Sequence, residues 1–82
     1  MGYEIKFSSQ AKKFIKNLDK KDALRILDKF NDVKSDPFRY IEHFEGKGYK
    51  LRIGDFRALI DIDFNRKIIF VRVFDKRGRV YK

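Results

Sequence analysis

Apolar and polar residues alternate along residues 49–60, a segment that reads Tyr-Lys-Leu-Arg-Ile-Gly-Asp-Phe-Arg-Ala-Leu-Ile. A period of two is typical of β-strands, and Gly54-Asp55 in the middle fits a two-residue hairpin turn with glycine at its first central position. The register that this turn predicts consists of the pairs Ile53–Phe56, Arg52–Arg57 and Leu51–Ala58. The segment therefore predicts a β-hairpin.

The two faces of this predicted hairpin differ in character. The apolar face, which suits a core, consists of Tyr49, Leu51, Ile53, Phe56, Ala58 and Ile60. The other face carries Lys50, Arg52 and Arg57. Because two arginines directly opposite each other repel and do not stabilise a sheet, we expect an anionic ligand at this face.

The first half of the chain predicts a short strand followed by two helices. Tyr3, Ile5 and Phe7 alternate with polar residues, and Ser8 and Ser9 then offer N-cap oxygens. Helical spacing follows at Ala11, Phe14, Ile15 and Leu18. A second helix, capped by Asp19 and ended by Pro37, has a broad apolar stripe made of Leu24, Ile26, Leu27, Phe30 and Val33. Only a few residues join the two predicted helices, so we expect them to form an antiparallel hairpin that packs on a sheet.

A second β-hairpin is predicted from Ala58 to Asp75, with its turn at Asn65-Arg66. Its register consists of the pairs Ile62–Ile69, Ile60–Val71 and Ala58–Val73. On the outer face this register places Leu59 opposite Arg72 and Arg57 opposite Phe74, so the cationic face widens. The predicted fold class is α+β: one domain, residues 1–82, with an N-terminal strand and a helical hairpin packed on a small, mainly antiparallel sheet.

Composition favours a polyanionic partner. The chain has 21 Lys and Arg against 12 Asp and Glu, a formal net charge of +9 on 82 residues and a pI near 9.9. Such a balance is typical of proteins that meet nucleic acid, although many small basic domains bind nothing charged. The absence of cysteine excludes disulfides and thiolate chemistry. No apolar run is long enough to span a bilayer, so we expect a cytoplasmic protein without a membrane partner.

The ordered combination of these features resembles the RelE/ParE superfamily of bacterial and archaeal toxins, which are small β-α-α-β-β-β proteins. Its most specific part is residues 49–57, followed by Lys76-Arg77 and the closing Val80-Tyr81. It is more similar to the RelE branch, whose members cut messenger RNA in the ribosomal A site, than to the gyrase-poisoning ParE branch. The resemblance implies a metal-independent endoribonuclease that needs the ribosome and no cofactor. It also implies an acidic, RelB-like antitoxin, for which we expect an apolar groove beside the helical hairpin.

The resemblance further implies roles on the cationic face. Attack of a 2′-hydroxyl on the adjacent phosphate needs a base, cations for the transition state and a proton for the leaving oxygen. The base would be Tyr81 or Lys50, helped by Arg52. Arg57 would stabilise the transition state, and Arg77 would act near the leaving group, chiefly electrostatically. The expected RNA-binding residues are Lys47, Arg72, Phe74, Lys76 and Arg79, although Phe74 fits a local aromatic cluster equally well.

Other polar residues favour simpler roles. His43 is the only histidine and has no second one with which to divide acid and base work, so we expect a surface or packing role. Asp61 and Asp63, with neither His nor Cys nearby, are expected to be solvated or to pair with Arg72. Glu45 stands where RelE-type toxins commonly carry a basic residue, which removes a phosphate contact.

Two other classes of function stay open on the sequence alone. A ParE-like toxin would inhibit gyrase by binding it and would need no catalytic constellation. A non-catalytic RNA-binding domain would use the same cations but would not need Tyr81 in particular. Cleavage of messenger RNA on programmed ribosomes, compared with gyrase-dependent DNA breaks, distinguishes these classes.

Overall fold

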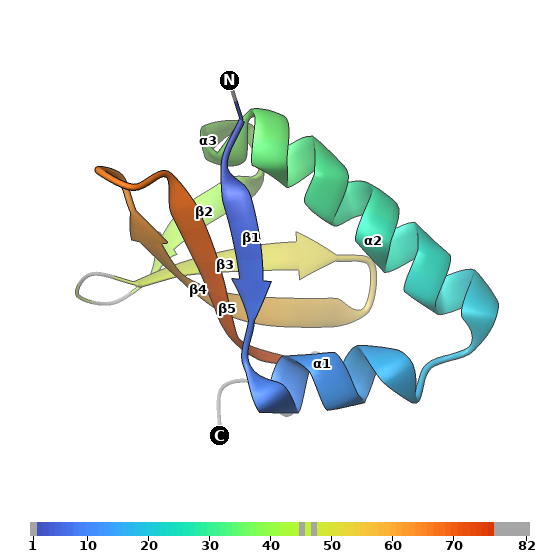
Figure 1. Cartoon of the computed structure of the whole chain (residues 1–82). Helices are drawn as coiled ribbons and strands as arrows, with labels where there is room; N and C mark the ends of the chain where they lie inside the picture. The colour runs from blue at the N-terminus through green and yellow to red at the C-terminus, as the bar shows by residue number, and fades with distance from the viewer. Residues whose placement is uncertain (1, 45, 47, 77–82) are drawn as a thin grey trace.

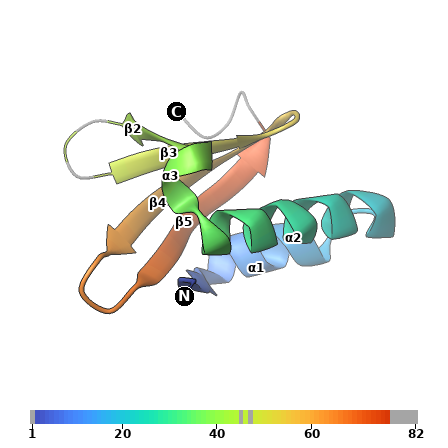
Figure 2. The ribbon, with the colours of Figure 1, turned by 90° about the horizontal axis from the view of Figure 1, so that it is seen from above.

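The computed structural model describes residues 2–44, 46 and 48–76. Its elements in chain order are β1 (Glu4–Phe7), α1 (Ser9–Lys16), α2 (Lys20–Ser35), α3 (Pro37–Tyr40), β2 (Ile41–Phe44), β3 (Gly48–Ile53), β4 (Phe56–Asp63) and β5 (Ile68–Lys76). The strands form one sheet in the order β1-β5-β4-β3-β2; β1 and β5 are parallel and the other neighbours are antiparallel. Helices α1 and α2 lie on one face of the sheet and diverge from the short turn that joins them (Figures 1 and 2). The predicted α+β class is confirmed.

The two long helices begin where the sequence predicts. The Ser8 Oγ accepts a hydrogen bond from the backbone N–H of Ala11 at 3.1 Å and so caps α1. Asp19 likewise occupies the N-cap position of α2, but its side chain makes no capping hydrogen bond. Pro37 ends α2 as expected and is buried at the first position of α3.

The apolar stripe of α2 is narrower than predicted. Ile26, Phe30 and Val33 are buried, whereas Leu24 and Leu27 are 53% and 44% exposed. A helix presents only one side to the sheet; Leu27 lies at the edge of that side and Leu24 lies nearly opposite to it. Within the described residues, no helix combines the length and apolarity needed to cross a membrane.

Two short elements were not predicted from the sequence. Helix α3 is a single turn, and β2 follows it directly and pairs with β3. This pairing places Ile41 opposite Leu51 and His43 opposite Tyr49. The sheet therefore extends one strand beyond the two predicted hairpins.

The first predicted hairpin is confirmed. Strands β3 and β4 pair Ile53 with Phe56 and Arg52 with Arg57, as the two-residue turn requires. Gly54 at the first central position has φ +57°, a conformation that glycine adopts without steric cost. The register of the first hairpin was therefore fixed by one glycine.

The second hairpin keeps the predicted register only near its turn. Ile62 pairs with Ile69 and Ile60 with Val71, but the register shifts between Leu59 and Ile60. Strand β5 thereby contains one extra residue, a β-bulge at Arg72. Beyond it the observed pairs are Leu59–Val73, Ala58–Phe74 and Arg57–Asp75. The predicted pairs Ala58–Val73, Leu59–Arg72 and Arg57–Phe74 are therefore wrong.

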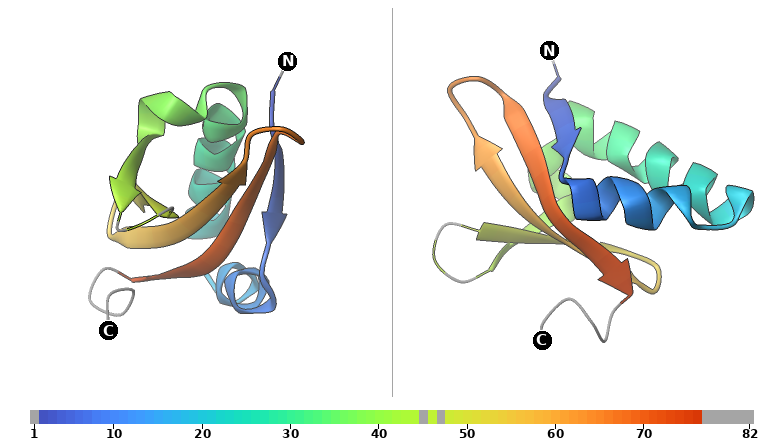
Figure 3. Two further views of the ribbon diagram at one scale, coloured as in Figure 1. Left: turned by 90° about the vertical axis from the view of Figure 1, so that its left-hand side faces the viewer. Right: turned by 60° about the horizontal axis from the view of Figure 1, so that its bottom comes forward.

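This bulge lies where the pairing of β1 with β5 stops. The last β1–β5 pair is Phe7–Val71, after which the Ser8 backbone N–H donates to the Val71 carbonyl at 2.9 Å and the Ser8 Oγ to the Arg72 carbonyl at 2.7 Å. Gln10 then continues the pairing with its side chain. Its Nε2 donates to the Phe74 carbonyl at 2.8 Å, and its Oε1 accepts from the Phe74 N–H at 2.9 Å. The start of α1 thus holds the end of β5, as Figure 3 shows.

Phenylalanines fill the core between the helices and the sheet. Phe74 is fully buried and contacts the rings of Phe14, Phe30 and Phe56, with centroids 5.5 to 5.8 Å apart. Phe7 packs edge-on against Phe30. These rings come from both helices and three strands, so one cluster connects every layer of the fold.

Candidate functional site

The candidate site lies on the outer face of the sheet, beside the Gly54-Asp55 turn. Arg52 on β3 and Arg57 on β4 occupy directly opposite positions there, as predicted. Arg52 is exposed, but Arg57 is only 8% exposed. The Arg57 Nη1 donates to the Phe56 carbonyl at 3.1 Å and to the Gly54 carbonyl at 3.3 Å. The hairpin backbone therefore fixes the orientation of this guanidinium, which sequence reasoning did not anticipate.

Lys50 lies on the same face, two residues before Arg52. Its Nζ is 3.7 Å from a carboxylate oxygen of Glu42 on β2, and both side chains are partly exposed. This ion pair could not be predicted from the sequence, because strand β2 was not predicted. Residues 41–44 read Ile-Glu-His-Phe, which does not alternate, so the sequence carries no strand signal there.

Arg72 is exposed and pairs with Asp61 at 2.8 Å, one of the roles expected for that carboxylate. Asp63 instead accepts the backbone N–H groups of Asn65 and Arg66, each at 3.1 Å. Its carboxylate is also 3.9 Å from the Arg66 side chain. Both aspartates therefore have partners within the sheet and its turn.

Phe74 is not available as a stacking surface. Because the bulge at Arg72 shifts every later residue of β5 by one position, Phe74 points into the core instead of outward. Of the two readings that the sequence allowed, the local aromatic cluster is correct.

Of the remaining predicted site residues, the structure describes Lys76. Lys76 is exposed and pairs with Phe56, next to the Arg57–Asp75 pair. Strand β5 therefore ends close to Arg57. Outside the described residues lie Glu45, Lys47, Arg77, Arg79 and Tyr81.

His43 has a packing role, as expected. Its Nε2 lies 2.6 Å from the Gly46 carbonyl oxygen, and its ring contacts Tyr49 edge-on. Both contacts belong to the β2–β3 hairpin, at the end of β3 away from Arg52. His43 is therefore not part of the cationic site.

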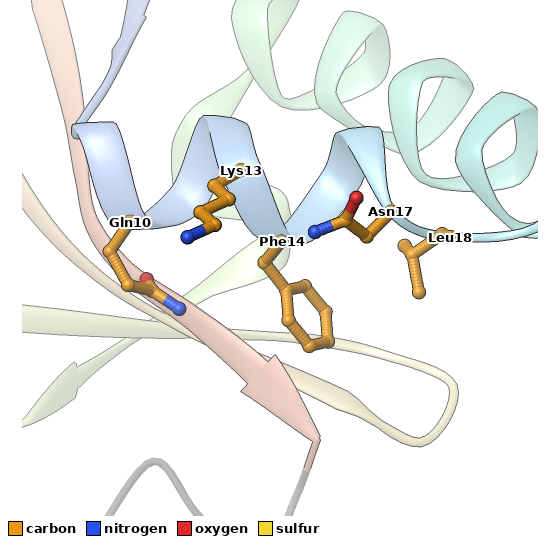
Figure 4. A pocket seen from close by; sticks show the side chains of 5 residues that line it. All are labelled: Gln10, Lys13, Phe14, Asn17 and Leu18. Carbon is orange, nitrogen blue, oxygen red and sulfur yellow. The ribbon is translucent and has the colours of Figure 1, made fainter.

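A cleft of about 300 Å³ opens along α1, near the end of β5 (Figure 4). Its lining consists of Gln10, Lys13, Phe14, Asn17 and Leu18. Phe14 and Leu18 are its apolar residues, and Gln10 and Asn17 contribute side-chain amides. Such a cleft can accept an apolar side chain from a partner.

Comparisons with known proteins identify the family of the chain. The family model described as the ParE toxin of type II toxin-antitoxin systems, parDE, matches residues 5–80. The chain belongs to the RelE/ParE toxin superfamily. No curated protein sequence matches it.

Solved structures of RelE-type toxins share its fold. The toxin-antitoxin complex RelBE2 from Mycobacterium tuberculosis matches with 20% identity and a TM-score of 0.83, over 94% of this chain and 100% of that one. The archaeal RelE-RelB complex from Pyrococcus horikoshii matches with 25% identity and a TM-score of 0.82, over 98% and 100%. The isolated RelE toxin from E. coli matches with 20% identity and a TM-score of 0.74, over 96% and 90%.

Proposed function

We propose that this RelE/ParE toxin is a ribosome-dependent endoribonuclease that cleaves messenger RNA in the ribosomal A site. One observation carries the proposal: Arg52 and Arg57 lie opposite each other beside the end of β5. That strand leads into the segment that contains Arg77 and Tyr81. Opposed arginines repel each other across a sheet, and a phosphate bound between them would offset that repulsion.

The proposed reaction is attack of a 2′-oxygen on the adjacent phosphorus. A bond forms between these atoms and the bond to the 5′-oxygen breaks, which leaves a 2′,3′-cyclic phosphate and a 5′-hydroxyl. Arg57 stabilises the extra charge of the transition state, since the Gly54 and Phe56 carbonyls already hold its guanidinium in place. Arg52, which is exposed, binds the substrate phosphate.

Proton transfer needs a base and a group near the leaving oxygen. The base is Tyr81 or Lys50, and the Lys50 Nζ lies 3.7 Å from a carboxylate oxygen of Glu42. Arg77 stabilises the negative charge on the leaving 5′-oxygen until that oxygen takes a proton from water, while the base keeps the proton of the 2′-hydroxyl. This open face offers little to orient a substrate, and the ribosome supplies the orientation.

Cleavage on programmed ribosomes tests the proposal. Arg57→Ala should lower the rate by a factor on the order of 10² to 10³, because it removes a group that acts on transition-state charge. Tyr81→Phe should also lower it, and free RNA should be cut poorly. Lys12→Ala on the exposed side of α1 is the matched control and should cut like the parent protein. Parent-like rates for both Arg57→Ala and Tyr81→Phe would show that the site is wrong.

The match to a ParE family model favours a second candidate, inhibition of gyrase by binding. The same purified protein should then cause gyrase-dependent DNA breaks and leave ribosome-bound messenger RNA intact. Arg57→Ala would have little effect on such an activity, because binding alone needs no transition-state stabilisation.

We also propose a cognate acidic antitoxin as the partner. The M. tuberculosis and P. horikoshii relatives were solved as toxin-antitoxin complexes. The net charge of +9 favours fast encounter with an acidic protein, and the α1 cleft offers a place for one of its leucine or isoleucine side chains. Co-expression with an acidic protein encoded next to it should restore growth.

A further inference from the structure

Four aromatic rings form a second surface feature, which we call the aromatic patch: Phe38, Phe64, Tyr49 and His43. The rings of Phe38 and Phe64 are stacked, with centroids 5.6 Å apart and planes 5° from parallel. Phe64 contacts Tyr49 edge-on, and Tyr49 contacts His43 edge-on. Phe38 is nevertheless 60% exposed and Phe64 46% exposed. The patch therefore presents flat apolar surface to solvent.

Phe64 in this patch is far from Arg57 in the candidate site. Phe64 directly follows β4, whereas Arg57 is the second residue of that strand. At about 3.3 Å per residue, the length of β4 separates them by roughly 25 Å. Figure 1 shows the two turns at the ends of β4 pointing away from each other. A ligand bound at the aromatic patch would therefore contact the protein at a second place, apart from Arg57.

Positive charge flanks the patch. Arg39 follows Phe38 in α3, and Arg66 and Lys67 belong to the turn after Phe64. Among the described residues, neither Arg39 nor Lys67 makes an ion pair. Asp63, the nearest acid of that turn, accepts the turn's own N–H groups and lies near Arg66. Exposed rings that adjoin basic residues in the chain are complementary to a base and its phosphates.

We propose that the aromatic patch binds single-stranded RNA, with one base stacked on Phe38 and the adjoining phosphates beside Arg39 and Lys67. Base-paired RNA is a poorer ligand because its bases are already stacked on each other. The flanking cations favour RNA over an apolar protein segment. This binding does not depend on cleavage, and it would give the protein a second RNA-binding site.

The test uses the full chain and fluorescence anisotropy. The probe is a labelled 2′-O-methyl oligoadenylate on the order of 12 nucleotides long, which lacks the attacking hydroxyl and so cannot report cleavage. A second probe of the same length carries abasic sites, which keep the charge and remove the stacking. The parent protein should bind the first probe more tightly than the second at equal salt.

Variants locate the contact. Phe38→Ala should weaken binding to oligoadenylate about 5- to 100-fold, the range that loss of base stacking produces, and should bind the two probes alike. Phe70→Ala, at an exposed phenylalanine on β5 outside the patch, is the matched control and should bind like the parent. Melting temperatures near the parent value would show that both variants fold, as their exposure leads us to expect.

Lys67 separates binding from folding. It has φ +57°, a conformation that glycine adopts more easily, so Lys67→Gly should melt at a higher temperature and yet bind oligoadenylate more weakly. Equal affinity of the parent for both probes would overturn the proposal. So would a dimer, seen by light scattering, that Phe38→Ala abolishes, because a second copy would then cover the patch. Neither result would change the outcome that we expect of the cleavage assay on ribosomes.

Discussion

At the scale of single residues, Arg57 combines a structural and a chemical role. Removing its buried guanidinium leaves the Gly54 and Phe56 carbonyls without their charged donor. We therefore expect Arg57→Ala to lower the free energy of unfolding by about 1–3 kcal/mol. Arg52→Ala, at the exposed opposite position, should change it by less than about 0.5 kcal/mol. Urea denaturation measures both, and equal effects would mean that the Arg57 hydrogen bonds contribute nothing.

Two turn residues with nearly the same φ should respond in opposite directions. Gly54 has φ +57° and so does Lys67. Gly54→Ala should destabilise the protein by about 1–2 kcal/mol, and Lys67→Gly should stabilise it by up to about 1 kcal/mol. A Cβ on Gly54 would lie 3.5 Å from the Arg25 guanidinium, an ordinary contact, so strain and not a clash causes the loss. Thermal unfolding of the two variants provides the comparison; shifts of the same sign would contradict it.

At the scale of elements, the Gln10 side chain replaces the backbone of a neighbouring strand at the end of β5. Its side-chain amide forms two hydrogen bonds with the Phe74 backbone. Gln10→Ala should lower the free energy of unfolding by about 1–2 kcal/mol and speed hydrogen exchange at the Phe74 amide. Gln10→Glu keeps the acceptor but loses the donor, so it should protect that amide better than alanine does. Unchanged exchange in Gln10→Ala would show that the end of β5 is held by its core contacts alone.

The hairpins show what the sequence can and cannot predict. Around Gly54 a single turn residue and strict alternation fix the register, so the opposed positions of Arg52 and Arg57 were predictable. The bulge at Arg72 leaves no comparable trace, because it arises where β1 ends and Ser8 binds the Val71 and Arg72 carbonyls. Contacts between residues 64 positions apart decide the face of Phe74. Alternation within β5 alone could not show this.

The same limit explains the two elements that the sequence did not reveal. Residues 37–40 make one helical turn, too short for apolar periodicity to appear. Residues 41–44, Ile-Glu-His-Phe, do not alternate between apolar and polar, and the strand has only 4 residues. Without β2, neither the Lys50–Glu42 pair nor the packing of His43 on Tyr49 could be predicted. The candidate site was thus predictable in its cations and not in their partners.

At the scale of the whole molecule, charge and shape should contribute separately to antitoxin binding. If the α1 cleft holds an apolar side chain of the partner, the complex should survive near 0.3 M salt, where the Debye length is roughly 6 Å. Leu18→Asp should weaken it at least about 10-fold, since it places a charge in an apolar contact. Leu24→Asp, at an exposed leucine outside the cleft, is the matched control. Dissociation of the parent complex by salt alone would contradict a role for the cleft.

The parallel pairing of β1 with β5 has a consequence for synthesis of the chain. Strand β1 is made before the other described strands, yet its only neighbour among them is β5, made more than sixty residues later. Phe74, in that same last strand, is also the ring on which both helices pack. Native structure therefore cannot accumulate gradually from the N-terminus, as it can in proteins with mostly local contacts. A ribosome that stalls before residue 68 carries a chain that cannot fold, so incomplete synthesis of this toxin yields no active product.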